Sequence, residues 1–304
     1  MNEYIQIIIN AIVGTFNWTW KSIIFEVPWH TNYFWGLIVL SLVVWGLEIA
    51  FPWRKNQAVL RKDFWLDAFY MFFNFFLFAI FISGFYTLLG KLFSEFGLSS
   101  SSFAIIDFSA WPMWGQLLVF FILLDFVQWF THILLHKYAF LWEFHKVHHS
   151  VKEMGFAAHL RYHWMENVLY KPLKTIAVML LGGFEPEQAY IVHFIAITIG
   201  HFNHSNIKIT YGSLKYVLNN PVMHLYHHAY ELPKGRYGVN FGISLSVWDY
   251  IFKTNYIPEE SGTIELGFKG DEVFPKDFIR QNTHGFKKQK KAEILEPLKN
   301  YKKA

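Results

Sequence analysis

Histidines at helical spacing are the residues of this chain with the clearest chemistry. Thirteen of its fifteen histidines lie between positions 132 and 228. Residues 132–136 read H-x-x-x-H, and residues 145–149 and 224–228 both read H-x-x-H-H. Positions three and four apart share one face of a helix, so eight imidazoles should project from three short helical faces. Imidazole binds zinc, copper, iron and nickel, and eight ligands are too many for one ion, which predicts two neighbouring metals.

Two further histidines would give each metal five ligands. His163 in "LRYHWMEN" and His204 in "GHFNHSN" are the candidates, and five ligands per metal leave one position open for oxygen. His159 and His201 are alternatives, because each is one helical turn from a candidate, whereas His193 is expected in packing or in a substrate channel. The predicted ligands are His132, His136, His145, His148, His149, His163, His204, His224, His227 and His228.

Carboxylates are scarce around these histidines. The sequence has neither the Glu-x-x-His pairs of soluble di-iron bundles nor the H-E-x-x-H motif of zinc proteases. Asp125, seven positions before His132 in an apolar run, is predicted to orient a ligand imidazole, with a hydrogen bond to a neighbouring helix as the alternative. The residues that could also orient ligands or line the site, or instead serve as caps, ion-pair partners or a turn, are Glu143, Glu166, Asn240 and Asp249.

The composition indicates an integral membrane protein. Of 304 residues, 53% are hydrophobic, 20% are aromatic and 16% are charged, whereas about a quarter are charged in ordinary soluble domains. The absence of cysteine excludes disulfides, thiolate-bound haem, cysteine-bound iron–sulfur clusters and a cysteine nucleophile. The net charge of +4 gives no indication of nucleic-acid binding, and no cleaved signal peptide is expected from the first residues.

Long apolar runs predict the helices that position the histidines. The runs at 33–51, 66–90 and 114–130 are long enough to cross a bilayer. Two more, near 167–182 and 187–204, are separated by a short turn and predict a helical hairpin. The expected fold is an all-α integral membrane bundle of about four transmembrane helices or two hairpins, with a histidine-rich helical cap.

Loop charges predict the orientation of this bundle. The loop 52–63 carries four basic residues and should be cytoplasmic, and the Ser-rich loop 91–113 should lie on the other side. Every histidine-rich segment then falls on the cytoplasmic face. Residues 4–27 mix apolar and polar positions, which predicts an interfacial helix or a shallow insertion.

Three regions follow from these patterns. Residues 1–113 are expected to form an N-terminal membrane region with the interfacial segment and two spans. Residues 114–257 hold the histidine boxes, one span and the hairpin, and should form the catalytic domain. Residues 258–304 are polar and end in a basic stretch, so we expect a solvated tail or one that binds lipid headgroups.

The order and spacing of the boxes resemble the fatty acid hydroxylase / sterol desaturase superfamily of membrane di-iron enzymes. The resemblance covers about 115–256 and includes P-x-x-H-x-x-H-H at 221–228. The ending "VWDYIFKTNY" is similar to the family's W-D-x-x-F-G-T, with Lys253 in place of glycine, and "LRYHWMEN" is similar to R-x-H-P-x-E, with Trp164 in place of proline. The stretch "FLWEFHKVHHS" most resembles the alkylglycerol monooxygenase branch and its bacterial relatives.

The resemblance implies an O2-dependent lipid hydroxylase or monooxygenase that acts on a fatty acyl, sterol or ether-lipid substrate. Its cofactors would be two iron ions, which zinc can replace in purified protein, together with O2 and an external reductant. No fused electron-transfer domain is evident, so the donor would be a separate cytochrome b5-like protein, a ferredoxin or a reduced pterin. The catalytic residues would be the metal ligands themselves, in an integral membrane protein with its active site on the cytoplasmic face.

Other functions remain open at this point. A desaturase of the same superfamily would use the same ligands. A membrane metal-binding or transport protein would carry ligands along a transmembrane path, whereas here they cluster at one end. A zinc-dependent membrane hydrolase is the third alternative, and it would be active without O2 or reductant.

Overall fold

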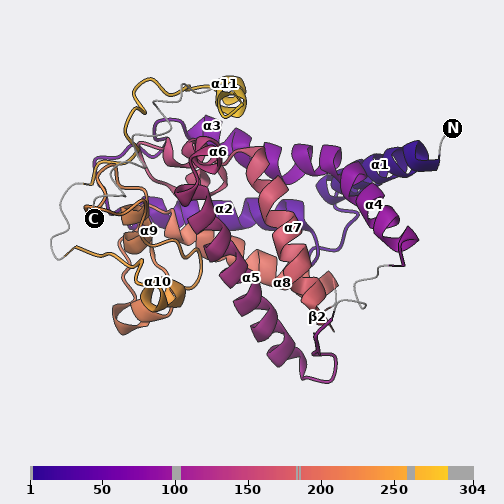
Figure 1. The fold of residues 1–304 in the computed structure, drawn as a ribbon. Coiled ribbons are helices and arrows are strands. Elements are labelled where there is room, and N and C mark those ends of the chain that lie inside the picture. Colours follow the sequence, from indigo (N-terminus) through magenta and orange to yellow (C-terminus); the bar gives the residue numbers. More distant parts are fainter. Residues whose placement is uncertain (1–2, 98–103, 183, 185, 259–263, 287–304) are drawn as a thin grey trace.

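The computed structural model describes residues 3–97, 104–182, 184, 186–258 and 264–286, which are mostly helical (Figure 1). The predicted all-α class is therefore confirmed, apart from one short two-stranded sheet. In it, β1 (Ile106–Asp107) runs parallel to β2 (Leu181–Gly182).

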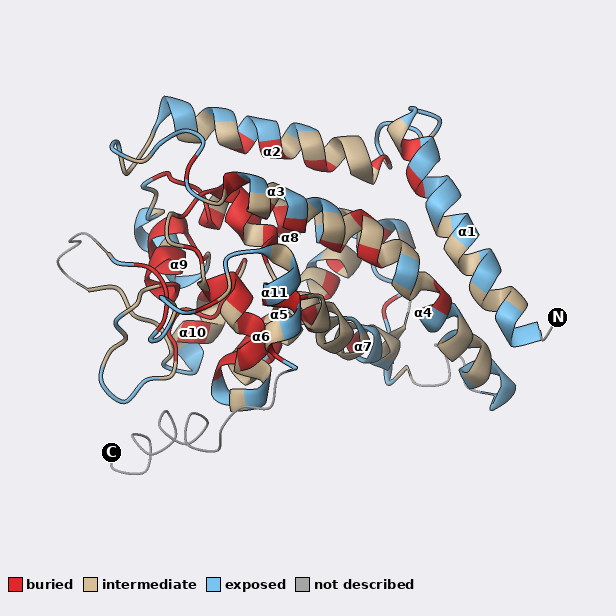
Figure 2. Ribbon diagram, turned by 90° about the horizontal axis from the view of Figure 1, so that it is seen from above, coloured by how far each residue is buried: buried red, intermediate tan, exposed pale blue. Residues whose placement is uncertain are grey.

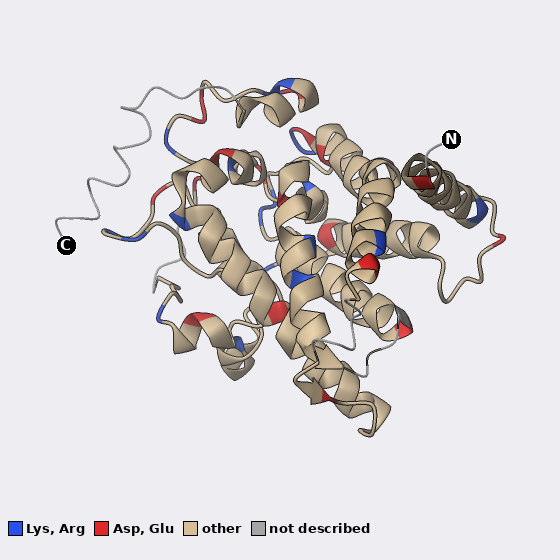
Figure 3. Ribbon diagram, turned by 45° about the vertical axis from the view of Figure 1, so that its right-hand side comes forward, with Lys and Arg blue, Asp and Glu red and all other residues tan. Residues whose placement is uncertain are grey.

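Three helices in the described part of the chain are long and apolar enough to cross a membrane. They are α2 (Tyr33–Ala50), the continuous helix from Phe64 to Glu95, and α5 (Met113–Lys137). The middle one consists of α3 (Phe64–Phe72), a π-helical turn (Phe73–Leu77) and α4 (Phe78–Glu95). Few charged residues lie on these long helices (Figure 3). The three spans predicted from the apolar runs thus correspond to helices.

The two helices expected in the hairpin are present as α7 (Trp164–Leu180) and α8 (Pro186–Asn203), but each packs on α5 and not along the other. Neither helix is among the three that meet the criteria for crossing a membrane, so four spans are not established. α7 contains Pro172, and it packs along α5. α8 packs against α5 and α2.

The N-terminal segment forms α1 (Glu3–Ile23), which packs along α4. The contact is close at Gly84, where an added Cβ would lie 2.8 Å from Ile8 Cγ2 and 3.2 Å from the Ile8 carbonyl oxygen. Elsewhere much of α1 is exposed (Figure 2). Its exposed residues include the large apolar Phe16 and Trp20.

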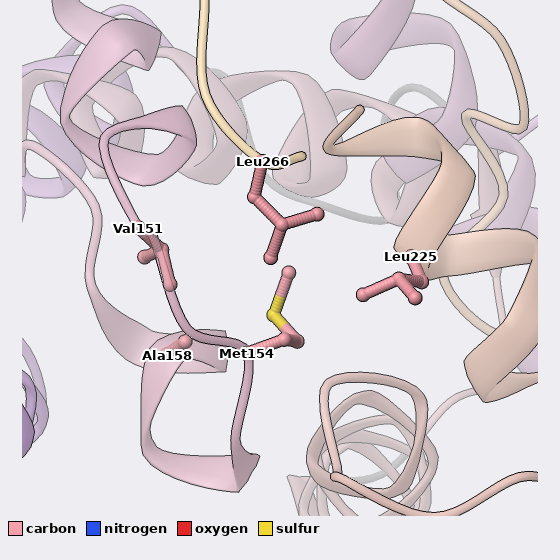
Figure 4. Packing of buried hydrophobic residues seen from close by; sticks show 5 residues of the cluster. All are labelled: Val151, Met154, Ala158, Leu225 and Leu266. Atoms are coloured by element: carbon pink, nitrogen blue, oxygen red, sulfur yellow. The ribbon is translucent and has the colours of Figure 1, made fainter. Parts of the chain in front are cut away.

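The cap consists of short helices joined by long loops. They are α6 (Ala139–His149), a 3-10 turn (Phe156–Leu160), a second 3-10 turn (Gly212–Tyr216), α9 (Pro221–His227), α10 (Val247–Ile251) and α11 (Phe278–His284). Buried residues concentrate around α6 and α9 (Figure 2). One apolar cluster joins the segment after α6 to α9 and the C-terminal region, through Val151, Met154, Ala158, Leu225 and Leu266 (Figure 4).

The ends of the long helices meet at this cap. Glu48, near the end of α2, accepts hydrogen bonds from the backbone N–H groups of Phe156 (2.7 Å) and Asn206 (2.8 Å). α6 follows α5 directly, and α9 packs against α8. The C-terminal ends of α2, α5 and α8 therefore lie at the same end of the bundle as the histidine boxes.

The C-terminal region differs from the predicted polar tail. Leu266, Phe268 and Phe274 are buried, and α11 packs on α6. The Tyr70 hydroxyl donates to Gln281 Oε1 (2.9 Å) and accepts from Asn282 Nδ2 (3.0 Å), so α11 is also fixed to α3. Residues 264–286 belong to the cap because their few apolar side chains fill it. The basic stretch at 287–304 lies outside the described residues.

Candidate metal centre

Two groups of histidines lie side by side in the cap. The first draws two residues from the end of α5, two from α6 and one from α9, and their ring nitrogens all lie within 4.8 Å of one another. Its members are His132, His136, His145, His149 and His227. The second group meets the same limit and consists of His148, His204, His224 and His228. Nine of the ten predicted ligands are thereby brought together.

The second group has the spacing of nitrogens around one ion. Nε2 of His224 lies 2.8 Å from Nε2 of His204 and 3.2 Å from Nε2 of His228, and the Nε2 atoms of His204 and His148 are 3.3 Å apart. Nitrogens that share an ion at about 2.1 Å would be roughly 3.0–3.4 Å apart. These four side chains are at most 5% exposed, so a bound ion would be shielded from water.

Each H-x-x-H-H box contributes to both groups. In α6, His145 and His149 belong to the first group and His148 to the second. In the α9 box the division is reversed, because His224 and His228 belong to the second group and His227 to the first. The rings of His149 and His228 stack with centroids 4.4 Å apart, so the two groups adjoin. Each box was expected to act as a single helical face. Instead each box divides between the two groups, because its middle histidine, His148 or His227, points toward the other group.

A short loop orients the first group through alternate carbonyls. Nδ1 of His132 donates to the carbonyl of Phe241 (2.8 Å), and Nδ1 of His227 donates to that of Val239 (2.7 Å). Nδ1 of His136 makes a longer bond of 3.4 Å to the carbonyl of Tyr237. In the second group, the carbonyl of Arg161 binds Nδ1 of His148 (3.0 Å) and that of Gly200 binds Nδ1 of His204 (2.7 Å). A proton held on Nδ1 leaves Nε2 as the metal ligand.

The donor atoms fit metal ions. Buried Nε2 atoms of His136, His149 and His227 have no hydrogen-bond partner among the described residues. Burial lowers the pKa of His148 to about 3 and holds the pKa values of His149 and His227 well below the usual range, so these rings are neutral near pH 7. Neutral imidazole is the form that binds iron, zinc, copper and nickel.

Neither Asp125 nor Asp249 contacts a grouped histidine, so their predicted orienting role needs correction. The alternative for Asp125, a hydrogen bond to a neighbouring helix, is present as its bond to Trp248 of α10. Asp249 accepts hydrogen bonds from the N–H groups of Phe241 (2.9 Å) and Gly242 (2.8 Å). Asp125 accepts from Trp248 Nε1 (2.9 Å) and from the N–H groups of Ser244 and Leu245. Both carboxylates therefore fix the loop that carries the Phe241 carbonyl. That carbonyl in turn binds His132.

Asn240 does not line the site either. Its backbone has a φ of 51°, a left-handed conformation that asparagine tolerates better than most residues. Its Nδ2 donates to the carbonyls of Met223 (2.9 Å) and Tyr256 (2.7 Å), and its Oδ1 accepts from the Tyr256 N–H (2.7 Å). Asn240 thus anchors the same loop between two of the carbonyls that bind histidines.

Among the carboxylates considered, Glu166 lies next to a histidine of the first group. Its Oε1 is 3.2 Å from Nδ1 of His145, and both side chains are buried. Glu143 instead pairs with Lys146 and lies 3.6 Å from Nε2 of His284. Glu166 is therefore the carboxylate placed to orient a ligand imidazole.

The structure does not bring His163 into either group. Nδ1 of His163 accepts from the Met165 N–H (3.0 Å) and caps α7, and Nε2 donates to the carbonyl of Asn282 (3.0 Å). Both ring nitrogens are thus used in hydrogen bonds to the backbone, which leaves none for a metal. In "LRYHWMEN", His163 stands directly before the first residue of a helix. That position suits a helix cap as well as a metal ligand, so the sequence alone could not separate the two roles.

The three remaining histidines lie around the second group and in the bundle. Nδ1 of His159 is 2.9 Å from Nδ1 of His201, whose Nε2 is 3.2 Å from Ser41 Oγ. The His159 ring centroid lies 4.9 Å from that of His204, but His159 is not in either group. His193 stacks on Tyr33, as expected for a packing role.

A buried network of charges supports His148 and was not predicted. Asp67 accepts from Arg61 and from Arg161 Nη1 (3.1 Å), and Arg161 Nη2 donates to Ser150 Oγ (2.9 Å). The backbone carbonyl of the same Arg161 binds His148. The sequence feature that could have indicated this network is Asp67, in the first turn of an apolar helix. A charged residue at such a position is rarely without a partner.

Comparisons with known proteins agree with this geometry. The family model described as fatty acid hydroxylase matches residues 117–254. Ornithine lipid hydroxylase OlsE of Rhizobium tropici is 29% identical over 185 residues, which cover 61% of this chain and 54% of that protein. Alkylglycerol monooxygenase of Homo sapiens is 29% identical over 137 residues, which cover 44% of this chain and 29% of that protein.

The matched segment spans only about half of the first of these relatives and less than a third of the second. No solved structure matches the chain. The family match includes the end of α5, both H-x-x-H-H boxes and the loop that orients the first group. Residues 117–254 of this chain, which hold the histidine boxes, are thus similar to the fatty acid hydroxylase family.

Proposed function

We propose that this protein is a membrane-bound, O2-dependent lipid hydroxylase that uses two iron ions. The observation that carries the proposal is the pair of adjacent histidine groups, buried at one end of an apolar bundle and inside a fatty acid hydroxylase segment. His132, His136, His145, His149 and His227 would hold one iron. His148, His204, His224 and His228 would hold the other.

Two irons would supply the oxidising power to cleave an unactivated C–H bond with O2. In that reaction one oxygen atom enters the substrate C–H bond and the other leaves as water, with two electrons and two protons from an external donor. The residues of the chain hold the ligand imidazoles in one tautomer through the loop 237–241, and the buried cap excludes water from the reacting centre.

Names of relatives favour hydroxylation over the alternative, desaturation. The relatives are named a lipid hydroxylase and a monooxygenase. We therefore propose that a fatty acyl, sterol or ether-lipid chain in the membrane is hydroxylated. The electrons would come from a separate donor, such as a cytochrome b5-like protein, a ferredoxin or a reduced pterin, on the cytoplasmic side.

Metal transport is disfavoured by the position of the ligands. The nine grouped histidines are all in the cap and at its junction with α5 and α8. Within the described residues, neither group extends along a membrane-spanning helix toward the opposite end. A transport path would need ligands at several depths of the bilayer.

The test is oxidation of lipids under ¹⁸O2 by the full chain in vesicles of its native lipids, with iron, a reductant and a compatible donor. We expect a lipid product that carries one ¹⁸O atom, and no product with zinc-loaded protein or with the His148→Ala variant. A product formed equally well with zinc and without O2 would indicate a hydrolase. Metal flux across the vesicles without any oxidised lipid would contradict the proposal as well.

A further inference from the structure

An apolar groove lies beside the first histidine group, between α5, α6 and α7. Its volume is about 230 Å³. Six of the residues that line it are Leu135, Phe140, Leu141, Glu166, Val168 and Leu169. Of these six, only Glu166 is polar, so the groove suits a hydrocarbon and offers little to a polar solute.

The inner wall of the groove is the outer side of the metal centre. Leu135 lies directly before the ligand His136 in α5 and is 1% exposed. Glu166 Oε1 is 3.2 Å from Nδ1 of His145, and Nε2 of the same ring is 3.1 Å from Nε2 of His132. A molecule that reaches Glu166 is therefore one imidazole ring away from the ligand nitrogens.

The outer end of the groove faces the surroundings of the bundle. Phe140, at the start of α6, is 64% exposed, and Ile176, two turns beyond Leu169 on α7, is 55% exposed. α5, which forms the opposite wall, is one of the candidate membrane-spanning helices. Exposed apolar side chains around such a helix are in contact with lipid when the protein is in a bilayer.

The one polar side chain that lines the groove is buried beside the first histidine group. Glu166 is 4% exposed, and its Oε1 lies 3.2 Å from Nδ1 of His145. A lipid headgroup would leave its own charges without partners there, which is costly. The occupant is therefore the apolar part of a lipid.

We propose that this groove binds one acyl chain of a membrane lipid and leads it from the bilayer to the first histidine group. The inference rests on the proposed function, because it assigns the path of the substrate chain. Leu169 and Val168 on α7 and Leu141 on α6 are its specificity-determining contacts. Larger side chains at these positions shorten the chain that the groove admits.

Photo-crosslinking tests the groove without turnover. The full chain is placed in phosphatidylcholine vesicles that contain a phosphatidylcholine with a diazirine on one acyl chain, and it is irradiated without O2. We expect cross-links on Leu141, Val168 and Leu169, and about tenfold less of this labelling in Leu169→Trp. The matched control is Leu118→Trp near the start of α5, where the side chain is 51% exposed and outside the groove. It should label like the wild type.

Metal content is measured on the same samples, and both tryptophan variants should keep it. Cross-links in wild-type protein that avoid α6 and α7 would overturn the inference, and this result does not depend on how a variant folds. Unchanged labelling of Leu169→Trp with its metal intact would overturn it too. Groove labelling without O2-dependent oxidation of any lipid would refute the proposed function alone, whereas oxidation without groove labelling would refute the groove alone.

Discussion

The protonation of single imidazoles decides what this centre can bind. In five of the nine grouped histidines Nδ1 donates to a backbone carbonyl, and in a sixth, His145, it faces Glu166. A carbonyl can only accept, so the proton stays on Nδ1 and Nε2 is free for a metal. Each of these partners therefore determines which ring nitrogen can bind a metal.

His163 provides a test at the scale of one residue. We expect His163→Ala to keep its metal and to lose about 0.5–2 kcal/mol of stability, because a helix cap is removed. His163→Asn should recover most of that stability, since asparagine is also a good cap. The measurements are metal content by mass spectrometry and thermal unfolding in detergent.

The matched comparison is His148→Ala, which removes a proposed ligand. This variant should lose metal and activity. If His163→Asn lost as much metal as His148→Ala, the cap assignment would be wrong and His163 would be a ligand.

At the scale of elements, the loop from Tyr237 to Leu245 acts as one unit. Its carbonyls bind three of the grouped imidazoles. Asp125 in α5, Asp249 in α10 and Asn240 within the loop fix its backbone. Residues that touch no metal ligand can therefore change the affinity for metal.

Asp249→Asn tests this unit. The carboxylate accepts from two backbone N–H groups, and an amide would turn a donor toward at least one of them. We expect metal affinity to fall by about 10–100-fold, as for other groups that orient ligands. Competition with a chelator measures it, and Asp107→Asn in the exposed strand β1 is the control. Wild-type affinity in Asp249→Asn would show that the loop is held without this carboxylate.

The buried network between α3 and Arg161 is a second unit. Asp67 is fully buried and balances Arg61 and Arg161. Asp67→Asn should lower the free energy of unfolding by about 3–5 kcal/mol, because two buried guanidinium groups lose their counter-charge.

Asp63→Asn is the matched control for Asp67→Asn. Asp63 meets Arg161 at 3.3 Å, and its side chain is 26% exposed. Its loss should cost no more than about 1 kcal/mol. Equal effects of the two substitutions in chemical denaturation would argue against a special role for Asp67.

Sequence patterns predicted the helices better than the loops. Apolar runs located α2, α3–α4, α5, α7 and α8 because length and hydropathy are local properties. The division of each histidine box between two groups could not be predicted, since it depends on where α9 lies relative to α6. The hydrogen bonds from the carbonyls of 237–241 to the histidines could not be predicted either, because every residue type has a backbone carbonyl.

At the scale of the whole molecule, ends of the long helices meet at the cap. The bundle therefore has a cap end and an opposite end. The 52–63 loop joins α2 to α3 at the cap, and Ser109 lies between β1 and α5 at the other end of α5. Loop charges predict that the cap is cytoplasmic.

The absence of cysteine makes this orientation easy to measure. Lys55→Cys and Ser109→Cys each place one thiol at an exposed position. In intact cells, we expect a membrane-impermeant maleimide to label Ser109→Cys and to label Lys55→Cys only after permeabilisation. Wild-type protein, which has no thiol, is the control. The reverse pattern would place the metal centre on the opposite face.

The crossed division of the two H-x-x-H-H boxes has a consequence for how the centre is filled. An ion in either group must fix α6 and α9 together, since each group takes histidines from both boxes. The second ion then meets ligands whose conformational entropy has already been lost, which gives positive cooperativity. We expect titration of the metal-free protein with iron or zinc to give a Hill coefficient above one and almost no half-filled species in native mass spectrometry. Independent filling of the two positions would mean that the cap is rigid before any metal arrives.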